Sequence, residues 1–239
     1  MLLYLIRHGE PDYKEDALTE TGWKQAHLVA GRLVESGVDE IHSSPMGRAR
    51  ETARPTAERL GLPVQVEPWA YELGSEGATT FPDGVSKRIS SLPPAYFQQE
   101  AFRKYGFDED LARIPALDNG ELPARCRMLI EGFDAMLAGL GYRRNAAGTY
   151  DVVAPHDRHV VFFCHVAMQR VLLGRALNLP FHFTASGFVA HFTGITILEF
   201  GPGGAEKTVS PALISYGDVG HLYRRSGGPL THYGSGQSF

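Results

Sequence analysis

The chain has 239 residues, 43% of them hydrophobic and 21% charged, and its 23 Lys and Arg against 27 Asp and Glu give a formal net charge of −4. This composition is typical of a soluble globular protein. The slight excess of acids argues against a nucleic-acid binder, and no apolar run approaches the roughly 20 residues of a membrane-spanning helix. Cys126 and Cys164 lack the close spacing of a metal site or a disulfide framework, so we expect a cytoplasmic protein.

The N-terminal part of the chain alternates between strand and helix patterns. Residues 2–6 form a continuous apolar run, which predicts a strand buried on both faces. Thr19 is the expected N-cap of an amphipathic helix that ends near Gly37. Further strands are predicted at residues 39–43 and 64–66. This alternation indicates βαβ units and a largely parallel sheet.

A second helix is predicted between the strands at 39–43 and 64–66. Ser44 is its expected N-cap and Pro45 its first residue, a position that suits proline. The helix pattern continues to about Leu60. Pro55 lies inside the pattern and removes one backbone donor, so we expect a kink or an interruption there.

The strand and helix alternation breaks at about residues 76–121, where prolines stand among aromatic residues. We interpret this stretch as a partly helical insertion over one edge of the sheet. The tail, about 226–239, is rich in Gly and Ser and is expected to be flexible. Residues 1–239 are therefore predicted to form one α/β domain.

The alternation of strands and helices resumes after the insertion. The predicted elements there are helices at 124–140 and 167–177, strands at 159–163, 194–200 and 213–216, and a Gly/Asn-rich loop after residue 140.

Basic side chains follow three of the predicted strands. They are Arg7 and His8 after the first strand, Arg48 soon after the second, and His165 after the strand at 159–163. In open α/β sheets ligands bind beyond the carboxyl ends of the strands, so these side chains are expected at one rim. The helices that follow two of these strands would add backbone N–H groups and positive helix ends. The arrangement predicts an electropositive pocket for phosphate.

A histidine held against a bound phosphoryl group is a competent nucleophile. Its neutral imidazole would attack phosphorus, while the arginines and the second histidine stabilise the charge on the equatorial oxygens. The leaving alkoxide needs a proton, and Glu72, soon after the strand at 64–66, is a candidate donor, with Glu76 as a close competitor. The pKa of the donor would have to be raised by burial or by the charge of the phosphate.

Three motifs together are similar to a known family. LIRHGE at residues 5–10, SSPMGRARETA at 43–53 and a Glu in YELGSEG at 71–77, with a late histidine after an apolar strand, resemble the histidine phosphatase superfamily, also called the phosphoglycerate-mutase-like family. GDVGHL near the end is similar to the family's C-terminal pattern, so the resemblance covers most of the chain. It implies a three-layer α/β/α sandwich with a mostly parallel central sheet, a helical cap insertion at about 76–121, and no required metal or cofactor.

The resemblance also implies a role for each candidate residue. His8 matches the phosphorylated nucleophile, and Glu72 matches the proton donor. Arg7, Arg48 and His165 match the phosphate clamp. The aromatic residues and cations of the insertion are the expected source of substrate specificity.

The sequence departs from the family pattern at three places. Lys14 stands where the family often has an Asn that assists phosphate binding. Val166 replaces the Gly that usually follows the late histidine, and Leu122 replaces the Ser of a GES segment. His182 and His191 alternate with apolar residues and are expected to pack or to flank the pocket.

The mutases of this superfamily continue after RHGE with an Asn and an F-x-G-W-x-D segment, and this sequence has neither. We therefore expect a phosphomonoester hydrolase that acts through a phosphohistidine on a small phosphorylated metabolite, with a small-molecule phosphate ester as its partner. A phosphoglycerate-mutase-type phosphotransferase and a catalytically silent phosphate-binding or signalling module are the alternatives.

The segment His156-Asp157-Arg158-His159 contains two histidines that could bind a metal ion. No third ligand stands at the spacing of a metal site, so no metal site is predicted.

Overall fold

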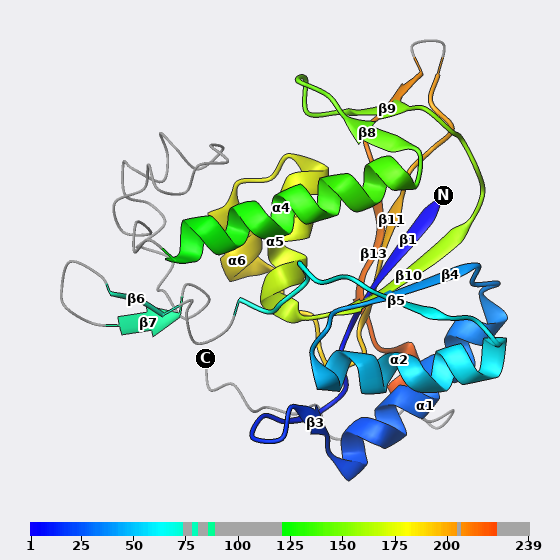
Figure 1. The fold of residues 1–239 in the computed structure, drawn as a ribbon, viewed down its shortest axis with the longest axis vertical. Coiled ribbons are helices and arrows are strands. Elements are labelled where there is room, and N and C mark those ends of the chain that lie inside the picture. The colour runs from blue at the N-terminus through cyan, green and yellow to red at the C-terminus, as the bar shows by residue number, and fades with distance from the viewer. Residues whose placement is uncertain (74–77, 81–85, 89–120, 205–206, 224–239) are drawn as a thin grey trace.

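The computed structural model describes residues 1–73, 78–80, 86–88, 121–204 and 207–223 (Figure 1). A six-stranded sheet in the order β13-β11-β1-β10-β4-β5 forms the centre of the described part. Its strands are β1 (Leu2–Arg7), β4 (Glu40–Ser43), β5 (Val64–Val66), β10 (His159–Cys164), β11 (Ile195–Glu199) and β13 (Ala212–Asp218). The helices that pack around the sheet are α1 (Glu20–Glu35), α2 (Gly47–Leu60), α4 (Glu121–Gly139), α5 (Val166–Leu177) and α6 (Phe181–Gly187).

The sheet is mixed but mostly parallel, as predicted. Strands β1, β10, β4 and β5 pair in parallel, whereas β11 runs antiparallel to both β1 and β13. Arg7 at the end of β1 is in register with Cys164 at the end of β10. Ser43 at the end of β4 pairs with Phe163. The carboxyl ends of three parallel strands therefore meet at one edge of the sheet.

Helices cover both faces of the sheet, with α1 and α2 on one side and α4, α5 and α6 on the other (Figure 1). Strand β1 shows why its sequence is a continuous apolar run. Leu3 and Leu5 belong to the core cluster with α4 and α5, whereas Tyr4 and Ile6 belong to the cluster with α1 and α2. Because successive strand residues point to opposite faces, both sets are buried. The predicted three-layer α/β/α sandwich is confirmed.

Several predicted local features differ from the structure around α2. The helix begins at Gly47 rather than at Pro45, and its N-cap, Met46, makes no side-chain capping bond. The Ser44 hydroxyl instead accepts the Met46 N–H before the helix begins, at 3.2 Å. Pro55 lies inside a helix that continues to Leu60, so the predicted interruption is wrong. In α1, by contrast, Thr19 is the N-cap and accepts a bond from the Gly22 N–H, as predicted.

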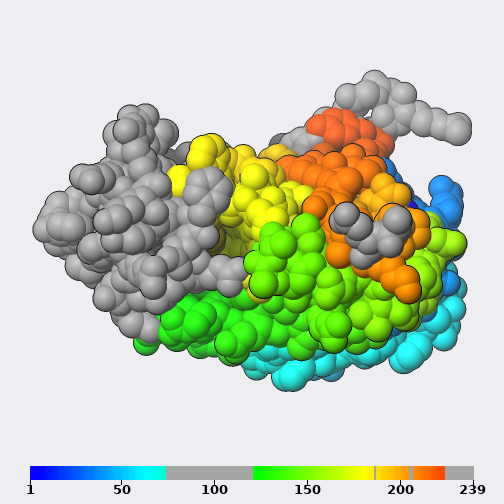
Figure 2. All heavy atoms as spheres, turned by 90° about the horizontal axis from the view of Figure 1, so that it is seen from above, coloured from blue at the N-terminus to red at the C-terminus, as the bar shows by residue number. Residues whose placement is uncertain are grey.

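The predicted Gly/Asn-rich loop after residue 140 contains two strands. They are β8 (Tyr142–Arg144) and β9 (Tyr150–Val152), which pair with β12 (Thr208–Val209) in a second sheet of order β12-β9-β8. The surfaces of β8–β9 and β12 lie side by side in Figure 2. Two short antiparallel hairpins are also present: β2 (Pro11–Asp12) pairs with β3 (Ala17–Leu18), and β6 (Ala78–Thr80) pairs with β7 (Ser86–Arg88).

The two cysteines, Cys126 and Cys164, are free and buried. No helix in the described ranges is long and apolar enough to cross a membrane. Most of the predicted insertion at 76–121, and the tail from residue 226, lie outside the described residues.

Gly22 in α1 packs directly on the loop that carries His8. A Cβ at residue 22 would lie 2.2 Å from the carbonyl oxygen of Glu10, and a Cβ at Gly9 would lie 2.8 Å from the carbonyl oxygen of Gly22. Because backbone atoms on both sides would have to move, Gly22→Ala is expected to lower the free energy of unfolding by about 1–3 kcal/mol. Urea denaturation measures this change.

Gly31 in the same helix is the matched control. A Cβ there would lie 3.5 Å from Nη1 of Arg59, an ordinary contact. Gly31→Ala should therefore raise the free energy of unfolding by about 0.5–1 kcal/mol, because alanine is the better helix former. Equal changes in the free energy of unfolding in Gly22→Ala and Gly31→Ala would contradict the close backbone contact at Gly22.

Candidate active site

His8 directly follows β1, and its imidazole is almost completely buried, with 1% of the residue exposed. Its backbone N–H donates to the Cys164 carbonyl at 2.9 Å, which fixes the loop to the end of β10. Its Nδ1 lies 2.7 Å from the Gly9 carbonyl oxygen. Because a carbonyl can only accept, Nδ1 carries the proton and Nε2 keeps a lone pair. Burial lowers the pKa of His8 well below its usual value, and Arg7 and Arg48 lower it further.

His165, the N-cap residue of α5, lies beside His8. The two imidazole centroids are 5.2 Å apart, and His165 is fully buried. Its Nε2 bonds to the Ser44 hydroxyl at 2.7 Å, a contact that joins the ends of β10 and β4. Burial lowers the pKa of His165 well below its usual value, and competing protonation of His8 and the charges of Arg48 and Arg7 lower it further. His165 is therefore a neutral hydrogen-bonding group near pH 7.

Arg7, the last residue of β1, is held on two sides. Its Nη1 donates to the Ala190 carbonyl at 2.7 Å, and its guanidinium lies 4.2 Å from the Phe192 ring centroid. Burial lowers the pKa of Arg7, but a guanidinium stays charged in proteins. Arg7 therefore places a fixed positive charge beside His8.

Arg48, in the first turn of α2, has an acidic partner. Its guanidinium forms an ion pair with Asp16, whose other carboxylate oxygen accepts the Gly47 N–H at 2.6 Å. Arg48 is 5% exposed. Asp16 thus orients the guanidinium while neutralising part of its charge.

Three buried side-chain nitrogens around His8 have no hydrogen-bond partner within the part of the chain that the structure describes. They are Nε of Arg7, Nε of Arg48 and Nδ1 of His165. Buried polar groups are normally satisfied, so three unpaired nitrogens on neighbouring residues indicate a binding site. The two guanidinium groups suit the oxygens of a phosphate, and so does Nδ1 of His165 in the tautomer in which it carries the proton.

Glu72 reaches the same site from the segment after β5. Its Oε1 accepts the N–H of Met168 at 2.9 Å and the N–H of Leu73 at 3.0 Å. Its Oε2 has one longer contact, 3.3 Å from the Ala167 N–H. Burial raises the pKa of Glu72, against the opposing effects of the Met168 and Ala167 N–H groups and of the Arg7 and Arg48 charges. Glu76, its predicted competitor, lies outside the described residues.

Carboxylates of this chain accept some of the N–H groups at the starts of the two helices, where backbone N–H groups are predicted to bind the anion. Glu72 accepts two of them at the start of α5, and Asp16 accepts the Gly47 N–H at the start of α2. The positive helix ends therefore hold the carboxylates that border the site.

The structure brings together the five predicted site residues, and it adds two that the sequence analysis missed. Arg170 in α5 is 6% exposed, and its Nε donates to the Phe188 carbonyl at 2.7 Å. The charge of Glu72 acts on Arg170, which places this arginine near the candidate acid. The second is Asp16, the partner of Arg48. No local pattern indicates either residue, because Arg170 is five residues after His165 and off the three- or four-residue spacing of one helix face, and Asp16 lies far from Arg48 in the sequence.

Thr193 supports the backbone of the site. Its N–H lies 3.0 Å from the Arg7 carbonyl oxygen and 3.3 Å from that of His8. Its φ is +54°, an unusual value for a β-branched residue. The Thr193 hydroxyl bonds to Nε2 of His221, in the GDVGHL motif, at 2.9 Å. The C-terminal motif therefore contacts the segment that holds Arg7 and His8 in place.

The three departures from the family pattern lie at different places. The Lys14 side chain is 89% exposed and lies 3.9 Å from the Glu15 carboxylate. Leu122 is buried in the core beside α5, and Val166 is buried at the start of that helix. His191 lies close enough to Arg7 for the charge to lower its pKa, although burial is the larger cause. His191 therefore flanks the pocket, as predicted.

The residues that the structure describes contain no group of three or more His, Cys, Asp or Glu side chains that could hold a metal ion. The two histidines of the string at 156–159 contact backbone oxygens: Nε2 of His156 lies 2.8 Å from the Leu140 carbonyl, and Nδ1 of His159 lies 2.5 Å from the Ser36 carbonyl.

Comparison with solved structures finds the same architecture. A phosphoserine phosphatase from Entamoeba histolytica, solved with phosphoserine, aligns with a TM-score of 0.59 at 20% identity and covers 92% of this chain and 98% of its own. The mycobacterial glucosyl-3-phosphoglycerate phosphatase Rv2419c aligns with a TM-score of 0.56 at 22% identity and covers 90% and 98%. These likenesses confirm the fold.

Comparison of sequences identifies the family. Residues 3–81 match the model of the histidine phosphatase superfamily (branch 1). The probable phosphoglycerate mutase GpmB of Yersinia enterocolitica is 30% identical over 189 residues, covering 75% of this chain and 76% of that protein. Its counterpart in Yersinia pestis is 31% identical over 192 residues, with the same coverage. The chain belongs to the histidine phosphatase superfamily.

Proposed function

We propose that this protein is a phosphomonoester hydrolase that transfers the phosphoryl group of a small phosphorylated metabolite to His8 and then to water. The observation that carries this proposal is the set of three unpaired buried nitrogens on Arg7, Arg48 and His165, the charged and aromatic neighbours of His8. They offer hydrogen bonds to the phosphate oxygens at the point where a nucleophile is held. The structural neighbours described above as phosphatases support the hydrolytic reaction class.

In the first step, the lone pair of His8 Nε2 attacks phosphorus, and an N–P bond forms as the ester P–O bond breaks. Arg7 and Arg48 balance the negative charge that spreads over the equatorial oxygens. His165 donates from Nδ1 if Ser44 donates to its Nε2, an arrangement that leaves Ser44 free to accept the Met46 N–H. The pocket therefore stabilises the transferring group without moving a proton on His165.

The leaving alkoxide takes a proton from Glu72. Oε1 of this residue already accepts two backbone N–H groups, whereas Oε2 has a single contact of 3.3 Å. We therefore assign the transferred proton to Oε2. In the second step a water molecule gives a proton back to Oε2 and attacks phosphorus, the N–P bond breaks, and inorganic phosphate leaves with neutral His8 restored.

A mutase is the second candidate, because the curated relatives are named as probable phosphoglycerate mutases. Hydrolysis is favoured because this sequence lacks the Asn and the F-x-G-W-x-D segment with which the mutases of the superfamily continue after RHGE. The silent phosphate-binding module is the least favoured alternative, because such a module has no need of an acid beside the nucleophile.

Incubation with 3-phosphoglycerate, followed by ³¹P NMR, separates these functions. The proposal predicts that any turnover of this compound releases inorganic phosphate, and that p-nitrophenyl phosphate is hydrolysed without an added phosphoryl donor. Formation of 2-phosphoglycerate faster than phosphate release would establish the mutase. The absence of turnover with both compounds and with a panel of phosphorylated metabolites would favour the silent module.

A further inference from the structure

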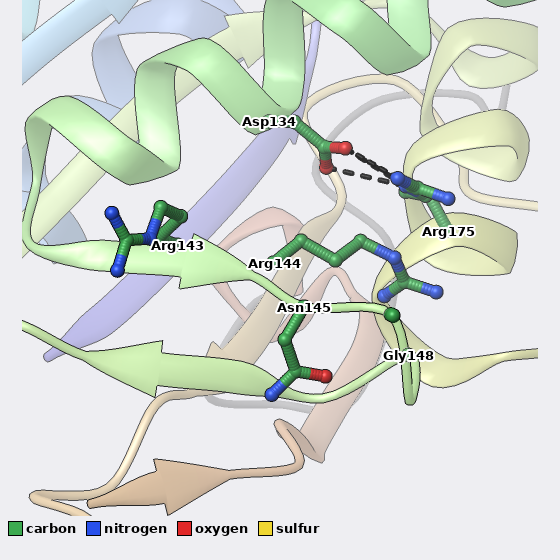
Figure 3. A pocket seen from close by; sticks show the side chains of 7 residues that line it. Asp134, Arg143, Arg144, Asn145, Gly148 and Arg175 are labelled. Atoms are coloured by element: carbon green, nitrogen blue, oxygen red, sulfur yellow. Dashed lines mark hydrogen bonds and ion pairs between the residues drawn. The ribbon is translucent and has the colours of Figure 1, made fainter.

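A basic cavity lies between α4, α5 and the β8–β9 hairpin (Figure 3). Its volume is about 360 Å³, within the range of small-ligand pockets. Its charged lining consists of Arg143, Arg144, Arg175 and Asp134. The proposed function does not use any of these residues.

This cavity is separate from the phosphate site at His8. Arg175 lies in the last turn of α5, nine residues after Val166, the first residue of that helix. Nine residues correspond to about 14 Å along a helix axis. His165 and the cavity are therefore at opposite ends of α5.

Two of the guanidinium groups are held in place by partners from different elements. Arg175 forms a two-pronged pair with Asp134 of α4, with Nε 3.1 and 3.2 Å from the two carboxylate oxygens and Nη2 2.5 Å from one of them. Arg144 donates from Nη2 to Oδ1 of Asn178 at 2.6 Å, and its guanidinium lies 5.4 Å from the Tyr150 ring centroid. Figure 3 shows the end of Arg144 reaching toward Arg175.

The charge of the lining favours an anion. Among the residues that the structure describes, the lining has three guanidinium groups and one carboxylate, Asp134, and Arg143 has a second carboxylate, Asp151, at 3.8 Å. Arginine presents paired N–H groups that match the oxygens of a phosphate. These lining groups carry a net positive charge, so the electrostatic attraction is greater for a ligand with two negative charges than for a ligand with one. Holding the arginines before the ligand arrives reduces the entropy lost on binding.

We propose that this cavity binds a small phosphate-bearing ligand as a dianion, with Arg144 and Arg175 as its main contacts. The turn of the hairpin, with Asn145, Ala146 and Gly148, forms the wall beside these two arginines. The ligand binds independently of catalysis at His8.

Titration of the ¹⁵N-labelled protein with inorganic phosphate at pH 7.5 and constant ionic strength tests the proposal. Backbone amide resonances of Asn145 and Gly148 should shift and saturate, in addition to any shifts at Gly9 and Val166 in the catalytic pocket. Shifts confined to the catalytic pocket, or shifts at the hairpin that do not saturate, would overturn the proposal. Failure of the protein to hydrolyse phosphate esters would overturn the proposed function and leave this site untouched.

Two variants at an exposed position provide the matched comparison. Ala146 lines the cavity without a side-chain bond to lose, so Ala146→Glu adds a carboxylate and Ala146→Gln adds the same bulk without charge. Ala146→Glu should weaken the phosphate affinity at the hairpin at least about fivefold, and Ala146→Gln should leave it unchanged. Arg144→Met should abolish the hairpin shifts. Equal affinities for the Glu and Gln variants, or unaltered binding in Arg144→Met, would contradict the proposal.

Discussion

Replacing His8 by alanine is expected to reduce the hydrolysis of p-nitrophenyl phosphate by at least about 10³-fold, the scale of loss when a nucleophile is removed. The reason is that Nε2 of His8 forms the bond to phosphorus, and no neighbouring group can replace it. His165, 5.2 Å away between ring centroids, is held by Ser44 and has its own role in binding the phosphate. Initial rates of p-nitrophenolate release measure the loss.

The circular dichroism spectrum and the thermal melting curve of the variant show whether it is folded. His27→Ala is the matched control, because His27 is an exposed histidine on α1, and it should retain full activity. Full activity in folded His8→Ala protein would exclude the phosphohistidine mechanism.

Replacing Glu72 by glutamine is expected to separate substrates by their leaving groups. An alkyl phosphate releases a strongly basic alkoxide that needs a proton, so its kcat/KM should fall by about 10²–10⁴-fold. p-Nitrophenyl phosphate releases a stable phenolate, and its kcat/KM should fall by less than about tenfold. Steady-state kinetics on both esters with the same enzyme preparations measures this difference.

Glu35→Gln, at an exposed position near the end of α1, is the control and should alter neither rate. Equal losses on the alkyl and aryl esters in Glu72→Gln would remove Glu72 from the role of acid. Such a result would leave its contacts with the start of α5 as a structural role.

The dependence of activity on pH follows from the two pKa shifts. Glu72 must be protonated to act as acid, and because its pKa is raised, kcat/KM for an alkyl phosphate should fall only as the pH rises through that raised value. His8 must be neutral to attack, and because its pKa is lowered, it stays neutral as the pH falls below its usual value of 6.5. His8 therefore does not limit activity until the pH is well below 6.5, and Glu72 sets the decrease toward high pH. In Glu72→Gln the decrease toward high pH should disappear.

The ionisation of the phosphate ester also changes in this pH range. This ionisation is the same for the unsubstituted enzyme and for Glu72→Gln, so the ratio of their kcat/KM values reports the titration of Glu72 alone. A decrease toward high pH that persists unchanged in Glu72→Gln would show that another group sets it.

Much of the architecture was predictable because its signals are local. The apolar run of β1 predicts burial on both faces, and Thr19 predicts the start of α1; both are confirmed. The basic residues at the strand ends could be placed at one rim because parallel strands share an edge. Placing them there required only knowing that the strands are parallel and where each strand ends, and the hydrophobic pattern indicates the strand ends. The order of the strands in the sheet is not encoded in that pattern.

The remaining features depend on contacts between distant segments. Asp16 neutralises part of the charge of Arg48 from a hairpin, and Glu72 accepts N–H groups about 95 residues further along the chain. No pattern within a short window encodes such pairs. The positive φ of Thr193 is equally invisible, because a β-branched residue is a poor choice for that conformation and only the surrounding contacts hold it there.

His8 is expected to carry the phosphoryl group during turnover. The most direct test is to mix the enzyme with a phosphate ester, quench within milliseconds in base, and map phosphorylated peptides by mass spectrometry, because phosphohistidine survives base and is lost in acid. We expect one acid-labile phosphoryl group on the peptide that contains His8, formed before phosphate is released. Turnover with no phosphorylated peptide, or with the phosphoryl group on another residue, would contradict it.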